Sequence, residues 1–286
     1  MKPQQFVRSI FQKLLSQADN QQTREQKGRC QYLGGGEILL SRTNHRLILP
    51  GWDLSLTPWI INSGTWEPAL TEALEEHCRP GMIALDIGAN IGWFSSIMAA
   101  SGAAVHAFEP NPRLESFLRK NIFLNAGPRT PLCSVNRCVV GSAPGEVQIS
   151  FPHWLVGGAG IHDSDQSQFL DSLIPEPVKT EMVTIDAFLS GRAIKRVDVI
   201  KIDVEGYEEE VIKGALNTIS HSTSLLVPLE YTRGRYSREF PTVLHSLFTQ
   251  IVVLPERRTL SCEDLIGYEQ GEFMRERPLL ELLCTK

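Results

Sequence analysis

An aspartate followed by a glycine-rich turn is the first sign of chemistry in the sequence. The stretch "IALDIGANIGWFSS" (residues 83–96) carries Asp86 at the end of an apolar run, then Gly88-x-Asn90-x-Gly92, then a pattern typical of a helix. A glycine in such a turn lets the backbone approach a ligand closely. The free N–H groups of a helix start favour an anionic group. The turn therefore predicts a nucleotide-like cofactor.

The residues of this turn favour S-adenosylmethionine over a dinucleotide. The dinucleotide fingerprint G-x-G-x-x-G, placed with its first glycine on Gly88, needs glycines where the chain has Asn90 and Trp93. A ligand with an ammonium beside a carboxylate fits better, because Asp86 could meet the cation while the helix start meets the anion. S-adenosylmethionine carries that pair of charges. A nicotinamide-dependent oxidoreductase is the weaker alternative.

A second acidic residue stands where the next apolar run stops. In "AAVHAFEP" (residues 103–110), the strand pattern ends at Glu109. An acid about twenty residues beyond a glycine turn, at the tip of the next strand, accepts hydrogen bonds from both ribose hydroxyls of a nucleotide. Glu109 is therefore the predicted ribose ligand, and Pro110 and Asn111 are expected to line the adenosine pocket. A helix cap or a solvated loop acid is the alternative role for Glu109.

Charged residues crowd one face of a later strand. In "VDVIKIDVEG" (residues 197–206), strand alternation places Lys201, Asp203 and Glu205 on the same face. Ligands of open parallel sheets bind beyond the carboxyl ends of the strands, so these acids are expected near the transferred group. Lys201 could hold either acid by a partly buried ion pair, and a structural charge network is the alternative. Glu230 repeats the pattern at the end of "SLLVPLEY" and could face the same crevice.

Other polar residues give weaker signals. The sequence has no C-x-x-C, HExxH or HxH spacing, so no metal site is predicted, although paired carboxylates leave a divalent ion open. His153 and His162 could reach the site as a base, but each is interpreted as an ordinary loop histidine.

Arg233, Arg235 and Arg238 could meet an anionic acceptor, although solvated side chains are the simpler interpretation. Cys133 and Cys138 are interpreted as packing residues.

Strands and helices must alternate to position these residues. The pattern predicts strands at 82–87, 104–108, 135–140 and 197–204, with helices at 92–100, 112–125 and 207–219. Such alternation predicts a parallel sheet with helices on both faces. A helix beginning near Pro68, a loop after residue 155, and a tail with one helix and two closing strands complete the expected domain.

The first 66 residues read as an extension. Apolar residues from Phe6 to Leu15 recur at helical spacing, and residues 36–61 mix short apolar runs with turn residues, which predicts small strands or hairpins. The short helix is expected to dock on its own domain or on a partner subunit, with membrane attachment as the weaker alternative. The expected division is 1–66 for the extension and 67–286 for the cofactor-binding domain.

Composition narrows the classes of protein. The chain has 286 residues, is 42% hydrophobic and carries a formal net charge of −5, which fits a globular domain and argues against a nucleic-acid surface. The six cysteines form no paired motif, and no segment approaches a membrane span. We expect a cytoplasmic protein without structural zinc, without a nucleic-acid partner and without integral membrane association.

The ordered motifs resemble the FkbM family of S-adenosylmethionine-dependent methyltransferases. The resemblance runs from about residue 64 to Glu230 and rests on "GTWEP", "LDIGANIGWFSS", "AFEPNP", "NIFLNA", "VTIDAFL", "VIKIDVEGYEEEVIKGA" and "LLVPLEY". Each motif alone is weak, whereas the ordered set is specific. The usual acid or amide after the third strand is replaced by "CVVGS", so the adenine contact is expected from the backbone around Val140.

The resemblance carries several expectations. It implies a class I Rossmann-like fold with a mostly parallel seven-stranded sheet and a hydroxyl on a sugar, glycan or natural product as acceptor, and a homo-oligomer is compatible with it. Asp203 or Glu205 is expected to orient the hydroxyl or accept its proton, with Lys201 beside them. A non-catalytic cofactor-binding module is a further alternative. The residues expected to bind the cofactor are Glu67, Asp86, Gly88, Ala89, Asn90, Glu109, Pro110, Asn111, Val140 and Asp203.

Overall fold

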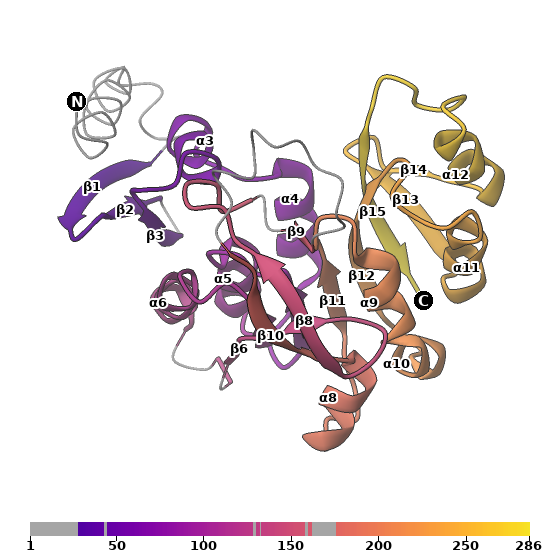
Figure 1. The fold of residues 1–286 in the computed structure, drawn as a ribbon, viewed down its shortest axis with the longest axis horizontal. Helices are drawn as coiled ribbons and strands as arrows, with labels where there is room; N and C mark the ends of the chain where they lie inside the picture. The colour runs from indigo at the N-terminus through magenta and orange to yellow at the C-terminus, as the bar shows by residue number, and fades with distance from the viewer. Residues whose placement is uncertain (1–27, 43–44, 128–129, 132, 158–159, 162–175) are drawn as a thin grey trace.

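The structure is a computed structural model, which describes residues 28–42, 45–127, 130–131, 133–157, 160–161 and 176–286 (Figure 1). The amphipathic helix predicted from Phe6 to Leu15 and the loop histidine His162 lie outside the described residues. In the described part of the chain, no helix combines the length and apolar character that crossing a bilayer requires.

A mixed eight-stranded sheet forms the centre of the molecule, in the order β14-β13-β15-β12-β11-β4-β5-β6. Neighbouring strands from β6 to β12 run parallel, whereas β15 runs antiparallel to both β12 and β13. The predicted mostly parallel, seven-stranded sheet is therefore wrong in both respects, because β15 returns between two strands and β14 adds to the edge. The strands are β4 (Ile83–Ile87), β5 (Ala104–Phe108), β6 (Ser134–Asn136), β11 (Val199–Ile202), β12 (Leu226–Thr232), β13 (Gln250–Leu254), β14 (Arg258–Thr259) and β15 (Leu279–Thr285).

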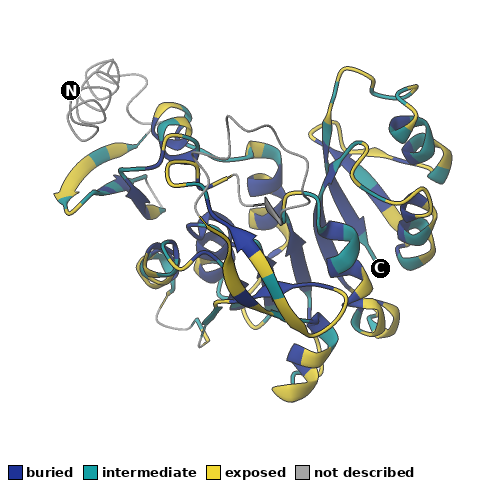
Figure 2. Cartoon of the chain, in the orientation of Figure 1, coloured by how far each residue is buried: buried dark blue, intermediate teal, exposed yellow. Residues whose placement is uncertain are grey.

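Helices cover both faces of this sheet, which confirms the α/β class. Side chains alternate along each strand, so Ala84 and Val199 pack with α4, α5 and α6, whereas Leu85 and Ile200 pack with the helices from α8 to α12. Figure 2 shows the central strands as the buried layer between these helices. The helices are α4 (Pro68–His77), α5 (Trp93–Ala100), α6 (Glu115–Asn125), α8 (Ile185–Gly191), α9 (Glu208–Lys213), α10 (Leu216–His221), α11 (Phe240–Leu247) and α12 (Cys262–Glu269).

A second sheet of four strands, β7-β10-β8-β9, was not predicted as a separate unit. The strand expected over 135–140 is divided, because β6 joins the central sheet while β7 pairs in parallel with β10. The helix expected over 207–219 is also divided. Gly214 ends α9, and a Cβ there would lie 2.0 Å from the carbonyl oxygen of Gly141. The strands are β7 (Val139–Val140), β8 (Gly145–Ser150), β9 (Gly160–Ile161) and β10 (Val178–Val183).

The N-terminal strands form a three-stranded antiparallel sheet of β1 (Arg29–Gly34), β2 (Glu37–Ser41) and β3 (Arg46–Pro50). Residues 56–61, expected within small strands or hairpins, instead belong to the helix α3 (Leu56–Ser63). The buried Asp53 carboxylate accepts from the Thr57 backbone N–H at 2.6 Å and so caps its first turn. The small sheet packs on α6, where Asn121 hydrogen-bonds both backbone groups of Ile48. The division at residue 66 stays a prediction.

Candidate functional site

A cavity of about 650 Å³ lies at the carboxyl ends of β4, β5 and β11 and reaches β12. This is the edge at which open α/β sheets bind their ligands. Two of the predicted residues, Asp86 and Asn111, lie outside the cavity lining. The predicted residues that line the cavity are Glu67, Gly88, Ala89, Asn90, Glu109, Pro110, Val140, Lys201, Asp203, Glu205 and Glu230.

The glycine turn after β4 brings backbone against backbone. Gly88 has φ 76°, and a Cβ at this position would lie 1.9 Å from the carbonyl oxygen of Asp203. The N–H groups of Gly88 and Ala89 both donate to the carbonyl oxygen of Phe108, at 3.0 and 2.9 Å. Asn90 also has a positive φ, of 52°. Gly88 is therefore required where two strand ends meet at the floor of the cavity.

Glu109 is held in place by the turn that it faces. Its carboxylate is buried and accepts from the backbone N–H groups of Asn90 at 2.9 Å and Asn111 at 2.8 Å. Burial raises the pKa of Glu109 to about 7, although both hydrogen bonds oppose the shift. Pro110 lines the cavity beside it, whereas Asn111 contributes its backbone to the Glu109 carboxylate. The acid is thus preorganised before any ligand arrives.

Lys201 joins the ends of β4 and β11. Its buried Nζ donates to the carbonyl oxygen of Gly88 at 3.1 Å and to Asp203 Oδ2 at 3.2 Å, and it lies 3.6 Å from Asp86 Oδ1. Burial alone would lower the pKa of Lys201, but the charges of Asp203, Asp86 and Glu67 outweigh burial and raise it. Of the two acids that Lys201 was expected to be able to hold, it pairs with Asp203, and Asp86 is its second partner.

Asp86 serves this lysine and does not line the cavity. Its side chain is fully buried, Oδ2 accepts from the Ser95 hydroxyl at 2.5 Å, and Oδ1 faces only Lys201. Register pairs Lys201 directly with Asp86 across the parallel strands, which explains the contact. The structure therefore does not bring Asp86 to where a cofactor ammonium would be met, as the sequence suggested. A buried carboxylate needs a positive charge beside it, and Lys201 supplies that charge for Asp86.

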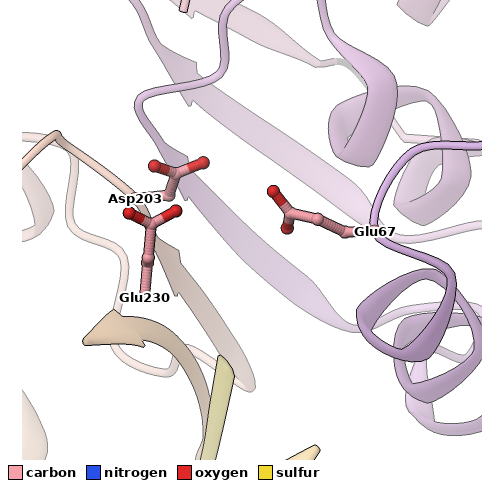
Figure 3. A group of neighbouring side chains, drawn as sticks. All are labelled: Glu67, Asp203 and Glu230. Atoms are coloured by element: carbon pink, nitrogen blue, oxygen red, sulfur yellow. The ribbon is translucent and has the colours of Figure 1, made fainter. Parts of the chain in front are cut away.

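Three carboxylates converge on one end of the cavity (Figure 3). Oxygen atoms of Glu67, Asp203 and Glu230 all lie within 4.8 Å of one another. Glu67 precedes α4 with φ 40°, while Asp203 follows β11 and Glu230 belongs to β12. A non-glycine residue in the left-handed region is strained, and such strain gathers at functional sites. Oxygen atoms this close are compatible with a positive charge between them, whether a metal ion or a cationic group of a ligand.

The electrostatics of this end oppose full ionisation. Burial and then the charge of Asp203 raise the pKa of Glu67 to about 8 and that of Glu230 to about 9. The same two causes raise the pKa of Glu205, which has φ 56° and lines the cavity, to about 7. Burial also raises the pKa of Glu281, a lining residue from β15. Among the described lining residues there are therefore more carboxylates than Lys201, the one lysine there, can balance.

Much of the remaining lining of the cavity is apolar. Val140 and Cys138 both line the cavity, and the sequence suggested Cys138 only as a packing residue. Tyr207 and Trp66 also line the cavity and were not anticipated. Trp59 on α3 is 60% exposed and faces the same cavity. The sequence missed it because residues 56–61 read as strand, whereas a lone acid within "PLLELLCTK" was a usable signal for Glu281.

Several weaker candidates lie away from the cavity lining. The backbone carbonyl of His153 accepts from Arg113 at 2.8 Å, and Arg233 donates to backbone carbonyls near residue 275. Arg235 donates to the backbone carbonyl of Glu205, and Arg238 is exposed. No described residue of this group lines the cavity, so the solvated or structural reading of the arginines fits the geometry best.

Comparison with known proteins agrees with the resemblance of the motifs. The model of the methyltransferase FkbM domain matches residues 86–258. The chain is 28% identical over 171 residues to the hexuronic acid methyltransferase AglP of Haloferax volcanii, which covers 60% of this chain and 65% of AglP. It is 26% identical over 188 residues to the 31-O-demethyl-FK506 methyltransferase FkbM of Streptomyces tacrolimicus, covering 54% of this chain and 70% of that one. The match thus spans less than two thirds of AglP.

Solved structures give only distant similarity. The tRNA (uracil-54, C5)-methyltransferase of Pyrococcus abyssi, in complex with S-adenosyl-L-homocysteine, has a TM-score of 0.43 and 12% identity, covering 89% of this chain and 45% of that one. The tRNA m1G37 methyltransferase of M. jannaschii has a TM-score of 0.44 and 12% identity, covering 87% and 54%. Because these TM-scores are low, the fold is assigned from the strand order of this chain and not from the solved structures.

The strand order, the glycine turn and the buried acid on the next strand define a Rossmann-like α/β protein built for a nucleotide-type cofactor. The family model covers more than half of the chain. The chain therefore belongs to the FkbM methyltransferase family, and its cofactor is S-adenosylmethionine.

The residues present fit this cofactor. Gly88 and Ala89 line the cavity with their backbone, and the buried Glu109 carboxylate stands across the turn. The carboxylates at the other end offer negative charge to a positively charged sulfur. The predictions of a cytoplasmic location, of no nucleic-acid partner and of a homo-oligomer stay predictions.

Proposed function

We propose that this protein transfers the methyl group of S-adenosylmethionine to a hydroxyl of a sugar, glycan or natural-product small molecule. The observation that carries the proposal is the carboxylate cluster Glu67, Asp203 and Glu230 in a cavity that the glycine turn and Glu109 also line. O-methylation needs a proton acceptor beside an electrophilic methyl group, and carboxylates of raised pKa suit that task.

The residues of this chain would divide the work. Gly88, Ala89 and Asn90 would pass the cofactor close to the backbone, and Glu109 would bind its ribose hydroxyls. Val140 and Pro110 would border the adenosine, and Asn111 and Asp86 would act through Glu109 and Lys201. When bound, S-adenosylmethionine supplies an electrophilic methyl group.

Asp203 and Glu205 would handle the acceptor. Both line the cavity, and Lys201 fixes Asp203 through a 3.2 Å contact, so Asp203 can orient a hydroxyl without moving. Glu205 has a pKa raised to about 7 and is thereby suited to take a proton near neutral pH. Most of the rate gain is expected from alignment of the acceptor oxygen with the methyl group.

The relatives support the acceptor class. AglP is named as a hexuronic acid methyltransferase and FkbM as a 31-O-demethyl-FK506 methyltransferase. The first name fits a sugar acceptor and the second a hydroxylated natural product. Methylation of a hexuronic acid at its carboxylate would need no proton acceptor, so the carboxylate cluster favours a hydroxyl as the acceptor.

A labelled-methyl screen tests this function. The protein is incubated with methyl-labelled S-adenosylmethionine and a panel of hydroxylated sugars, sugar acids and natural-product scaffolds. Label should appear in at least one hydroxylated acceptor and fall at least tenfold with Asp203→Ala or Glu205→Ala. Unchanged transfer in both variants would remove their catalytic role. Binding of NADH without S-adenosylmethionine would favour the oxidoreductase alternative, and cofactor binding without transfer to any acceptor class would favour the non-catalytic module.

A further inference from the structure

We propose that Glu67, Asp203 and Glu230 form a proton-exchanging cluster that distinguishes S-adenosylmethionine from its product S-adenosylhomocysteine by charge. The cluster would release a proton when the positively charged cofactor binds, and would hold one when the neutral product takes its place. This inference rests on the proposed function and concerns the same cavity.

The geometry of the cluster demands a cation. Oxygen atoms of its three carboxylates lie within 4.8 Å of one another (Figure 3). Negative charges so close, in a partly buried site, cannot all persist without a proton or a positive partner. Buried acids are usually paired with an arginine or a lysine, but the described residues do not provide one for each acid of the cluster. The cluster is therefore left to share protons or to receive a cation from a ligand.

The positive charge available from the protein is already divided. Lys201 is the one basic side chain among the described residues that line the cavity. It lies 3.2 Å from Asp203 and 3.6 Å from the fully buried Asp86, so its single positive charge is shared between these two acids. Glu67 and Glu230 make no ion pair with a described residue. Their charge is the part of the cluster that a ligand can compensate.

Burial and the neighbouring charges also favour a proton on Glu67 and Glu230. Burial, followed by the charge of Asp203, raises the pKa of Glu67 to about 8 and that of Glu230 to about 9. A positive charge placed among these acids would lower those pKa values and expel a proton. The other charged or titratable groups that face the cluster from neighbouring elements are Lys201, Glu205, Glu208, Tyr236 and Glu281.

The charge of the site would stay balanced through methyl transfer. The acceptor O–H bond breaks and an O–CH₃ bond forms, while the electron pair of the broken S–CH₃ bond stays on sulfur. The hydroxyl proton passes to Glu205, which lines the same cavity, and is then shared with the cluster. One positive charge on sulfur disappears and one negative charge on the protein is neutralised, so the net charge inside the cavity does not change. The cluster would then hold its proton beside the neutral product and favour exchange of that product for fresh cofactor.

Calorimetry measures this linkage without a known acceptor. S-adenosylmethionine and S-adenosylhomocysteine are each titrated into the wild-type chain near pH 8, in HEPES and in Tris, whose ionisation enthalpies differ. The difference in observed heat gives the protons exchanged. We expect release of about half a proton or more with S-adenosylmethionine and close to none with S-adenosylhomocysteine. We also expect S-adenosylmethionine to bind about tenfold more tightly, the equivalent of one pKa unit.

Two variants assign the protons to the cluster. Glu230→Gln should reduce the proton release and narrow the preference for S-adenosylmethionine over S-adenosylhomocysteine. Glu75→Gln, an exposed change on the helix that follows Glu67, should leave both values unchanged. Mg²⁺ should weaken binding of S-adenosylmethionine by competing for the same carboxylates, and strengthened binding would overturn the proposal. Equal proton counts for the two ligands would overturn the cluster alone, whereas failure of both ligands to bind would also contradict the proposed function.

Discussion

The two ends of the cavity contain carboxylates that are held in opposite ways. At the turn end, Glu109 accepts two backbone hydrogen bonds, from residues that are near it in sequence or in the adjacent turn. At the cluster end, Glu67, Asp203 and Glu230 come from three separate elements and face one another with one lysine nearby. Glu109 has its two backbone donors and Asp203 has Lys201, whereas Glu67 and Glu230 make no ion pair with a described residue.

This difference separates orientation from charge. A carboxylate with its hydrogen-bonding oxygens engaged by N–H groups is fixed in position and suits a neutral partner such as a ribose hydroxyl. Carboxylates that repel each other keep a high proton affinity and suit a partner that brings a positive charge or delivers a proton. We infer that the first end recognises the cofactor's nucleoside and the second end serves the transferred group.

The largest loss of stability is expected from substitution of Gly88 at the turn end. In Gly88→Ala the new Cβ would meet the Asp203 carbonyl oxygen at 1.9 Å, on a backbone with φ 76°. We expect loss of about 5 kcal/mol of stability, or failure to fold, because backbone cannot move aside. Thermal unfolding measures the effect. Gly145→Ala, where a Cβ meets nothing within 4 Å, is the control, and an equal melting temperature in both variants would contradict the close approach.

The cluster end should depend next on its lysine. Lys201→Met leaves Asp86 buried without a cation, and breaking a buried pair in this way should cost about 3 to 4 kcal/mol. Urea unfolding near pH 7 measures the loss. Lys213→Met removes exposed ion pairs with Glu209 and Glu210 and should cost less than about 1 kcal/mol. Equal losses in the two variants would show that Lys201 is not the support of the cluster.

Glu109→Gln should separate the two ends by ligand binding. The amide cannot accept from both Asn90 and Asn111, and one of its own N–H groups would oppose a backbone donor. We expect affinity for S-adenosylmethionine to fall about tenfold to a hundredfold, measured by calorimetry, while the chain stays folded. Glu115→Gln on α6, outside the cavity lining, should bind as the wild type does. Undiminished affinity in Glu109→Gln would count against the ribose assignment.

The smallest effect should appear in the pH dependence of stability. The folded-state pKa of Glu230 is raised to about 9, chiefly by burial, so the folded chain keeps a proton that the unfolded chain has lost. Between about pH 5 and 9 this makes wild-type stability fall as pH rises. Glu230→Gln should therefore be more stable than the wild type by about 1 kcal/mol at pH 8 and no more stable near pH 4. Melting curves across this range would contradict the account if the difference shrank with rising pH.

The turn end could be predicted from the sequence to a greater degree than the cluster end. Gly88 and Glu109 follow apolar strands and obey a spacing that strand and turn geometry impose locally. Glu67 and Glu230 come together because of the strand order and the direction in which the chain enters α4. Asp86 does not line the cavity and instead pairs with Lys201. No local pattern reports which strands become neighbours.

The fold shows the same limit. Strand and helix alternation located β4, β5 and β11, because each apolar run is bounded by turn residues. The position of β15 between β12 and β13, and the separation of β7 from β6, are decided by pairing between distant segments. Residues 56–63 became a helix because the buried Asp53 carboxylate caps its first turn. The strand pairings are tertiary and leave no periodic trace in one sequence, whereas the contact of Asp53 with Thr57 is local and was a usable signal.

The central claim is that this cavity binds S-adenosylmethionine, and one calorimetric comparison tests it most directly. The wild-type chain is titrated with S-adenosylmethionine and, separately, with NADH. We predict saturable one-to-one binding of S-adenosylmethionine and no heat of binding with NADH, because Asn90 and Trp93 occupy the positions of the dinucleotide glycines. Saturable binding of NADH without binding of S-adenosylmethionine would contradict the account.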